Sequence, residues 1–288
     1  MVDRDGDKVK KRLVYIWSLR NAAADRAGQQ IAYKGGTRYM KSVLESLVEA
    51  LETTVLGDLY SLETIIFDDD SGYAADGEKL REYGFVAGNS AHWFFPPQLE
   101  IQGRSVASLM QGVPSSYRRY AKDDPRRLAG KASFEARVQQ ALVEARADVV
   151  LLDGLLIILD TLIRPKAVFH NRIVNIHPGI TSAASPYRRR GAHATWDALY
   201  GARGMKVIDW QTMQTQPVPV CDRTGASLHY VDAGIDSGEV IHEALHTTIA
   251  PDDTILELRW NNFNHSLFPV MRQGLAKLAV DRETALSA

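Results

Sequence analysis

The run Val149–Leu152 constrains the fold most, because its four consecutive apolar residues are followed at once by Asp153. A strand without a polar position is buried on both faces, as the central strands of parallel sheets are. The runs Leu13–Ser18 and Ile173–Ile176 predict two further buried strands. A sheet of such strands needs helices to cover it on both faces.

Three segments have the spacing of helices. Apolar residues recur at helical intervals from Met40 to Leu51, with Thr37 as the expected N-cap, and Phe134–Ala147 predicts an amphipathic helix. Ile255–Ala279 predicts a closing helix. The alternation of strands and helices therefore predicts an α/β fold with a mainly parallel sheet and helices on both faces.

Composition argues against several classes of protein. The chain has 288 residues and a net charge of −1, which gives no reason to expect nucleic acid or an anionic membrane as a partner. Its one cysteine, Cys221, allows no intrachain disulfide and suits a reducing compartment, so we expect a cytoplasmic protein. The most apolar run, Val149–Leu159, is too short to span a bilayer. We expect a disordered leader over residues 1–11 and a single domain over 12–285.

Polar residues end one predicted strand and follow another. Asn175 and His177 come at the end of the strand that starts at Ile173, and Asp236 lies in a glycine-rich acidic loop after the strand that holds His229. Ligands of open parallel sheets bind beyond the carboxyl ends of strands. An amide and an imidazolium can stabilise an oxyanion, and an imidazole with a carboxylate can move protons, so the three residues are candidates for acyl transfer. The alternatives are a turn cap for Asn175, a hydrogen-bonded loop histidine for His177 and a turn residue for Asp236.

Several motifs in the chain occur together in one known family. They are Asn-Ile-His-Pro-Gly at 175–179, Pro186-Tyr187, Gly191 and GASLHYVDAGIDSGEVI at 225–241. This combination resembles the folate-dependent formyltransferases of the glycinamide ribonucleotide transformylase type, in which Thr/Ser-x-His is followed by an Asp seven residues later, as His229 is by Asp236. With RLVYIWSLRN and GGTRYMKSVLE included, the chain resembles most the N5-hydroxyornithine formyltransferases of pyoverdine-type siderophore pathways.

The resemblance implies a Rossmann-like formyltransferase fold, N10-formyltetrahydrofolate as co-substrate and no metal. It implies that Asn175 donates to the oxyanion, that His177 stabilises it and relays a proton, and that Asp236 orients His177. It also implies a pterin pocket formed by two loops. The residues expected to line that pocket are Leu156, Ile157, Leu159, Val231, Asp232, Gly234 and Ile235.

Two segments depart from the family and are expected as insertions, near residues 98–132 and 205–223. The acceptor is then a small-molecule amine or hydroxylamine, and N5-hydroxyornithine is favoured because N-hydroxylation lowers the basicity of the nitrogen. Its carboxylate is expected at the start of the first long helix, where cations and backbone amides converge. The residues concerned are Lys34, Gly35, Gly36, Thr37 and Arg38; the alternative is an ordinary helix N-terminus with solvated cations.

Other functions remain open at this point. The same residue set suits a formyltransferase for another amine or a sugar amine, a formyltetrahydrofolate hydrolase with water as acceptor, or a folate-binding protein without activity. The pattern His-Glu-x-x-His at 242–246 is typical of zinc hydrolases, but it binds zinc on a helix. Here a strand is predicted, on which the two histidines lie roughly 13 Å apart. Asp68–Asp70 and the basic-aromatic run 117–127 are interpreted as solvated surface.

Overall fold

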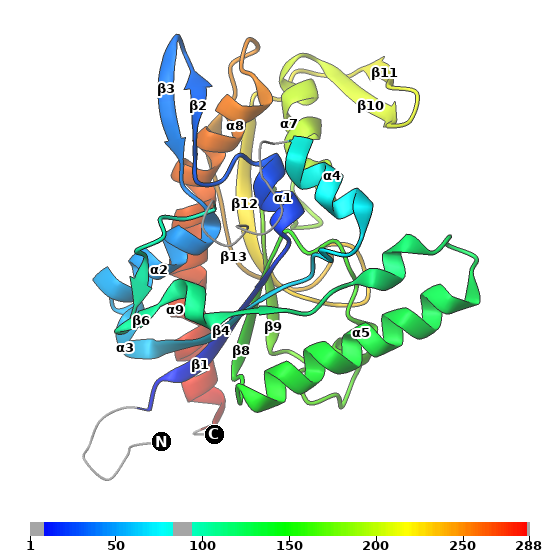
Figure 1. The fold of residues 1–288 in the computed structure, drawn as a ribbon. Helices are drawn as coiled ribbons and strands as arrows, with labels where there is room; N and C mark the ends of the chain where they lie inside the picture. Colours follow the sequence, from blue (N-terminus) through cyan, green and yellow to red (C-terminus); the bar gives the residue numbers. More distant parts are fainter. Residues whose placement is uncertain (1–8, 83–93, 287–288) are drawn as a thin grey trace.

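The computed structural model describes residues 9–82 and 94–286. Within these residues, one seven-stranded sheet has the order β13-β12-β9-β8-β1-β4-β7 (Figure 1). Neighbours from β9 to β7 run parallel, whereas β12 is antiparallel to both β9 and β13. The strands are β1 (Lys11–Trp17), β4 (Tyr60–Phe67), β7 (Met110–Gly112), β8 (Val149–Asp153), β9 (Ile173–His177), β12 (Arg223–Tyr230) and β13 (Val240–Thr248). The predicted mainly parallel sheet is confirmed.

Helices cover both faces of the sheet, as predicted. Figure 1 shows α2, α3 and α9 on one side and α5 on the other. The side chains of β1 alternate accordingly: Tyr15 belongs to the core beneath α2 and α9, and Ile16 to the core beneath α5. The helices are α1 (Leu19–Ala24), α2 (Val43–Thr53), α3 (Leu56–Leu59), α4 (Ala74–Glu82), α5 (Pro125–Glu144), α6 (Asp160–Ile163), α7 (Ala194–Ala202), α8 (Ile255–Asn262), α9 (Phe268–Leu286), and the short turns η2 (Val106–Leu109), η3 (Ser116–Arg119) and η4 (Phe263–Leu267).

The segment before α2 is a hairpin, so the predicted N-cap is wrong. Strands β2 (Gln29–Tyr33) and β3 (Gly36–Met40) pair through a two-residue turn in which Lys34 and Gly35 both have positive φ, +44° and +78°. That conformation is typical of a tight hairpin turn. Helix α2 is capped instead by Ser42, whose hydroxyl accepts from the Glu45 backbone while the Glu45 carboxylate accepts from the Ser42 backbone.

The segment 98–132 is more regular than expected. It holds the small hairpin β5 (Glu100–Ile101) and β6 (Arg104–Ser105), the edge strand β7 and the first turns of α5. Helix α5 begins at Pro125 rather than Phe134, after the N-cap Asp124. The early start was not predicted because Gly130 lies in this segment and glycine disfavours helices. In the structure a Cβ at position 130 would lie 2.6 Å from Cβ of Tyr117, so only glycine allows the helix to pack against Tyr117.

Residues 205–217 form a third hairpin, β10 (Met205–Asp209) with β11 (Gln214–Pro217). Of the predicted leader, residues 1–8 lie outside the described part, and β1 begins at Lys11. The domain bounds and both insertions stay predictions. The strand predicted for the zinc-like motif is confirmed as part of β13, where His242 meets Gln273 at 2.8 Å. Among the described helices, none has both the length and the apolar character to cross a membrane.

Candidate active site

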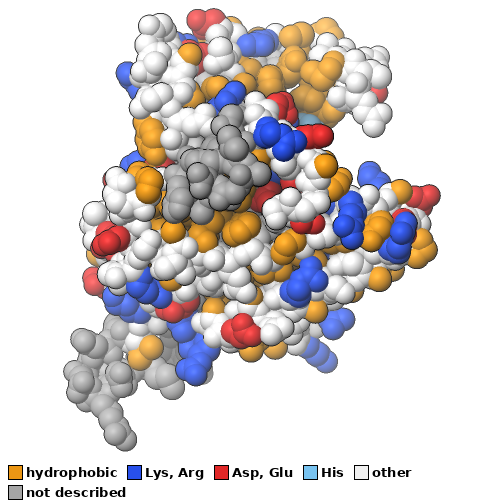
Figure 2. All heavy atoms as spheres, viewed as in Figure 1, with side chains coloured by type: hydrophobic (Ala, Val, Ile, Leu, Met, Phe, Trp, Pro, Cys, Tyr) orange, Lys and Arg blue, Asp and Glu red, His pale blue; other side chains and the backbone are white. Residues whose placement is uncertain are grey.

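A pocket of about 360 Å³ lies where β8 and β9 end and where the loop after β12 folds back over them. On the face shown in Figure 2, hydrophobic side chains gather in the region where Figure 1 places α7 and the β10–β11 hairpin, and the surface below them is notched. The pocket is lined by Asn21, Leu152, Gly154, Leu155, Leu156, Ile157, Ile158, Asn175, Ile176, His177, Pro178, Gly191, Ala192, His229, Val231, Asp232, Gly234, Ile235 and Asp236.

Strand pairing brings the polar residues of this pocket together. Asn175 and His177 are two positions apart on β9 and therefore share one face of the sheet. Antiparallel pairing with β12 sets His229 opposite Asn175. The predicted set Asn175, His177 and Asp236 is thus assembled by two segments, β9 and the loop after β12, and His229 of β12 joins it.

The Asp236 carboxylate contacts Asn175, both histidines and the backbone of Gly191. Its Oδ1 accepts from Nδ2 of Asn175 at 3.1 Å and lies 3.4 Å from Nε2 of His229. Its Oδ2 lies 3.3 Å from Nδ1 of His177 and accepts from the backbone N–H of Gly191 at 2.8 Å. One carboxylate therefore holds an amide and two imidazoles in fixed positions.

Each histidine uses its other nitrogen on a backbone carbonyl. Nε2 of His177 lies 3.0 Å from the oxygen of Arg189, and Nδ1 of His229 lies 2.8 Å from the oxygen of Tyr230. A carbonyl only accepts, so these two nitrogens carry protons. Any proton that enters or leaves either ring does so at the nitrogen that faces Asp236.

Burial and charge shift the protonation of these groups. Burial alone would raise the pKa of Asp236, but the hydrogen bond with His229, the charge that His177 carries when it is protonated at low pH, and the Gly191 N–H together hold its pKa well below the usual range. Burial lowers the pKa of His177, against the attraction of Asp236. The resting state at neutral pH is accordingly a carboxylate beside a neutral His177.

One wall of the pocket has apolar side chains and unused backbone groups. Leu156 is 71% exposed and Ile235 is 64% exposed, although both line the pocket. No other described residue hydrogen-bonds to the backbone of the segment from Leu155 to Ile158. Such a wall suits a flat heterocycle that needs apolar cover and a few backbone hydrogen bonds.

Of the seven residues predicted for this wall, six line the pocket and Leu159 does not. Leu156, Ile157, Val231, Gly234 and Ile235 line the pocket, as does Asp232. The Asp232 carboxylate accepts from the Gly234 backbone and the Ser237 hydroxyl, so it shapes the loop.

Leu159 is not brought to the pocket. It is fully buried in the core beneath α5, and its carbonyl accepts from Leu162 and Ile163 at the start of α6.

The residues predicted to bind the acceptor lie at the β2–β3 hairpin, and none of Lys34, Gly35, Gly36, Thr37 and Arg38 lines the pocket. The helix N-terminus expected there is wrong, because Lys34 and Gly35 form the hairpin turn. The Lys34 ammonium pairs with Asp253 at 2.6 Å. The Arg38 guanidinium lies over the ring of Tyr33, 5.3 Å from its centroid.

Sequence reasoning missed several lining residues. They are Asn21, Leu152, Gly154, Leu155, Ile158, Ile176, Pro178, Gly191, Ala192 and His229. Asn21 carried a signal similar to that of Asn175, an amide near the end of a buried strand, here β1. Gly191 was recognised only as part of the family motif, and its backbone N–H holds Asp236. Ala192 carried no signal in the sequence.

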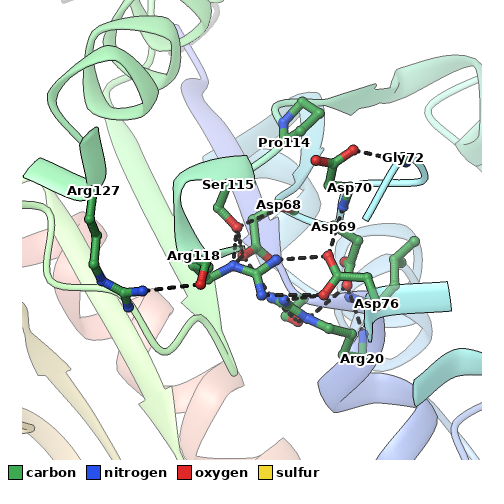
Figure 3. Close-up of polar contacts among 12 residues, drawn as sticks. Arg20, Asp68, Asp69, Asp70, Gly72, Asp76, Pro114, Ser115, Arg118 and Arg127 are labelled. Atoms are coloured by element: carbon green, nitrogen blue, oxygen red, sulfur yellow. Dashed lines mark hydrogen bonds and ion pairs between the residues drawn. The ribbon is translucent and has the colours of Figure 1, made fainter. Parts of the chain in front are cut away.

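A second polar cluster lies beyond β1 and β4, and it corrects an interpretation (Figure 3). Asp68 and Asp69, expected to be solvated, are 1% and 5% exposed. The Arg20 guanidinium lies 2.8 Å from both Asp68 and Asp76, and 3.0 Å from Asp69. Arg118, also expected to be solvated, lies 2.8 Å from Asp76. We call these five residues the β4-end network.

Comparison with known proteins places these observations in a family context. Residues 100–271 match the family described as Formyl transferase. The chain is 58% identical to the structure described as "PvdF of pyoverdin biosynthesis is a structurally unique N10-formyltetrahydrofolate-dependent formyltransferase", with a TM-score of 0.88, 94% of this chain and 99% of that chain covered.

Two more distant structures share the fold. Glycinamide ribonucleotide transformylase 1 from Symbiobacterium toebii has 16% identity and a TM-score of 0.53, with 95% of this chain and 89% of that one covered. Phosphoribosylglycinamide formyltransferase from Brucella melitensis has 16% identity and a TM-score of 0.51, with coverage of 94% and 96%. At this identity the likeness concerns the fold alone.

Proposed function

Because this chain belongs to the formyl transferase family, we propose that it transfers a formyl group from N10-formyltetrahydrofolate to the side-chain nitrogen of N5-hydroxyornithine, for hydroxamate siderophore synthesis. The observation that carries the proposal is the convergence of Asn175, His177 and Asp236 at one pocket. The relative described as acting in pyoverdin biosynthesis, 58% identical, supports the choice of acceptor. A cytoplasmic location is part of the proposal.

The pocket wall formed by the segment from Leu155 to Ile158 would hold the pterin of the folate. Its backbone N–H and C=O groups are unused by other described residues, and Leu156 and Ile235 expose apolar surface that a ring can cover. When bound there, the folate supplies the formyl group, and side chains of the protein stabilise the oxyanion and handle the protons.

Asn175 would stabilise the oxyanion. One N–H of its amide is directed to Asp236 at 3.1 Å, which fixes the side chain, and the other N–H lies towards His229 at 3.4 Å, longer than a good hydrogen bond. A formyl oxygen in the pocket can accept from that second N–H, because giving up the long contact with His229 costs less free energy than breaking a well-formed hydrogen bond. A donor fixed before the reaction acts on developing charge without reorganising.

His177 and Asp236 would handle a proton together. His177 is neutral at rest because burial lowers its pKa, and its free nitrogen Nδ1 faces Oδ2 of Asp236 at 3.3 Å. A proton taken up at Nδ1 produces an imidazolium that the carboxylate stabilises. The pair can therefore hold a proton during transfer and release it afterwards.

The experiment offers formyltetrahydrofolate with N5-hydroxyornithine, ornithine, lysine, glycinamide ribonucleotide, an amino sugar or water alone, and follows each product by mass spectrometry. We expect the hydroxyornithine product to form fastest. Equal or faster formylation of another amine would overturn the acceptor and leave the formyltransferase proposal standing. Formate release unaffected by any amine would identify a hydrolase, and folate binding without turnover a binding protein.

A further inference from the structure

A second carboxylate stands beside the pocket. Asp153 is the last residue of β8, and its chain neighbours Leu152 and Gly154 both line the pocket. Its partner across the β8–β9 ladder, Ile176, lines the pocket as well. The proton-handling pair described above makes no use of Asp153.

Asp153 lies on the opposite face of the sheet from the catalytic set. Residues alternate along each strand, so Asp153 and Ile176 share a face with the buried Tyr15, whereas Asn175 and His177 share the other with Leu152. At the carboxyl edge the two faces meet, and the pocket reaches round this edge. The folate wall and the catalytic set approach the pocket from one side, which leaves the Asp153 side for the acceptor.

The Asp153 carboxylate is held at one oxygen and open at the other. The fully buried Tyr15 hydroxyl donates to Oδ2 at 2.5 Å. No described residue donates to Oδ1, and the largely buried residue keeps some exposed surface. A fixed carboxylate with a free oxygen, next to residues that line a pocket, can accept a proton or a hydrogen bond from a ligand.

Few charged groups surround Asp153. Tyr15 of β1 donates a hydrogen bond to it, and the negative charge of Asp25, next to α1, raises its pKa. Asp25 is itself paired with Arg259 of α8 at 3.0 Å. Asn21 of α1 covers Gly154, where a Cβ would lie 2.2 Å from its Nδ2. The only side chain that donates to Asp153 among the described residues is thus a neutral hydroxyl.

We propose that Asp153, positioned by Tyr15 beside the residues that line the pocket, is the base that deprotonates the attacking nitrogen of the acceptor. The inference rests on the proposed function. The nitrogen lone pair forms the new C–N bond while the C=O electron pair moves onto oxygen beside Asn175. Asp153 then takes the N–H proton and passes it to solvent. When the oxyanion collapses, the bond to the folate nitrogen breaks, and that nitrogen takes a proton that the His177–Asp236 pair has first taken up from solvent. This uptake balances the proton that Asp153 releases to solvent.

The two carboxylates suit these separate tasks. Burial raises the pKa of Asp153 to about 7, further raised by Asp25 and opposed by the Tyr15 hydroxyl. The pKa of Asp236 is instead held below its usual range. A base works best with a pKa near the working pH, and Asp236 holds protons too weakly for that task.

The test uses three variants of the full chain. Asp153→Asn keeps an acceptor for Tyr15 and should lower turnover by ~10²-fold, while the affinity for tetrahydrofolate stays within about twofold. Tyr15→Phe removes a donor that lowers the Asp153 pKa, so the acidic limb of the pH–rate profile should move to higher pH. Asp25→Asn removes a nearby negative charge and should move the same limb to lower pH.

A readout without turnover accompanies these rates. Infrared difference spectra of wild type against Asp153→Asn should show one carboxyl that titrates at about pH 7. A carboxyl that titrates in the ordinary range near pH 4, or turnover of Asp153→Asn within about threefold of wild type, would overturn the inference. If wild type formylates no amine, the proposed function fails, and the infrared titration still decides the state of Asp153.

Discussion

Polar side chains gather at the ends of two strands of the same sheet, but the two clusters have different interaction partners. At the end of β4, Asp68 and Asp69 meet the guanidinium of Arg20 within 3.0 Å. At the end of β9, Asn175 and His177 meet one carboxylate and an open pocket. In the β4-end network the charges are neutralised inside the protein, whereas at the pocket one amide N–H of Asn175 has only a long contact, 3.4 Å to His229, and can turn to a ligand. A cluster at a strand end becomes a site only when its partners leave hydrogen-bonding capacity unused.

The largest effect should come from removing the cation of the β4-end network. Arg20→Ala leaves Asp68, Asp69 and Asp76 buried with too little positive charge, so we expect the free energy of unfolding to fall by about 3–5 kcal/mol. Urea unfolding measures it. The matched control is Arg126→Ala, whose guanidinium is paired with Asp124 at 2.6 Å but is 71% exposed; its midpoint should not move. Equal midpoints for both variants would refute the contrast.

The next effect tests the open site. Asn175→Ala removes the proposed oxyanion donor and should lower turnover by ~10²–10³-fold, with little change in unfolding free energy. Asn264→Ala is the control, because that amide is exposed and donates only to the Trp260 carbonyl among the described residues. Near-full activity of Asn175→Ala would mean that another group stabilises the oxyanion.

The two regions should also respond to pH with opposite sign. Burial, with the neighbouring Asp68, raises the folded-state pKa of Asp69 to about 7, against Arg20. Its contribution to stability is complete below the unfolded pKa of about 3.9 and is lost as pH rises to about 7. The lowered pKa of Asp236 works the other way: its contribution is present above about pH 3.9 and is lost as pH falls further.

Urea unfolding across this range separates the two carboxylates. Asp69→Asn should flatten the decline in stability between about pH 4 and about pH 7, and Asp236→Asn should leave that decline in place while removing the loss below about pH 4. A decline unchanged in Asp69→Asn would assign it to another buried carboxyl, such as Asp153.

The smallest effect should be at the β2–β3 hairpin. Arg38 lies over the rings of Tyr33 and Trp260, 5.3 and 6.0 Å from their centroids, and does not line the pocket. We therefore expect Arg38→Ala to change the acceptor KM by less than about threefold, since an exposed cation–π contact contributes little. A rise of about tenfold or more, with the folate KM unchanged, would restore the acceptor role predicted from sequence.

Much of the fold and the catalytic set could be predicted because their signals are local. The apolar runs of β1, β8 and β9 are uninterrupted, and Asn175 and His177 sit at the end of one of them. Asp236 was found through its fixed spacing from His229, which reflects a loop that must fold back from β12.

The errors arose where a distant partner decides the outcome. The burial of Asp68 depends on Arg20, 48 positions earlier in the chain. The hairpin at Lys34 and Gly35 depends on a turn conformation that a Gly-Gly pair suggests equally for a helix start. The early start of α5 depends on Tyr117, whose contact requires Gly130. None of these pairings is visible in the residues around the position itself.

The pairing of β9 with β12 has a consequence for how such enzymes can diverge. His229 stands opposite Asn175 only in one register, and a single inserted or deleted residue in β12 would turn His229 to the other face of the sheet. The β10–β11 hairpin forms a two-stranded sheet of its own among the described residues. Length changes should therefore accumulate in that hairpin during evolution and be selected against in β12, where they would displace a residue of the site.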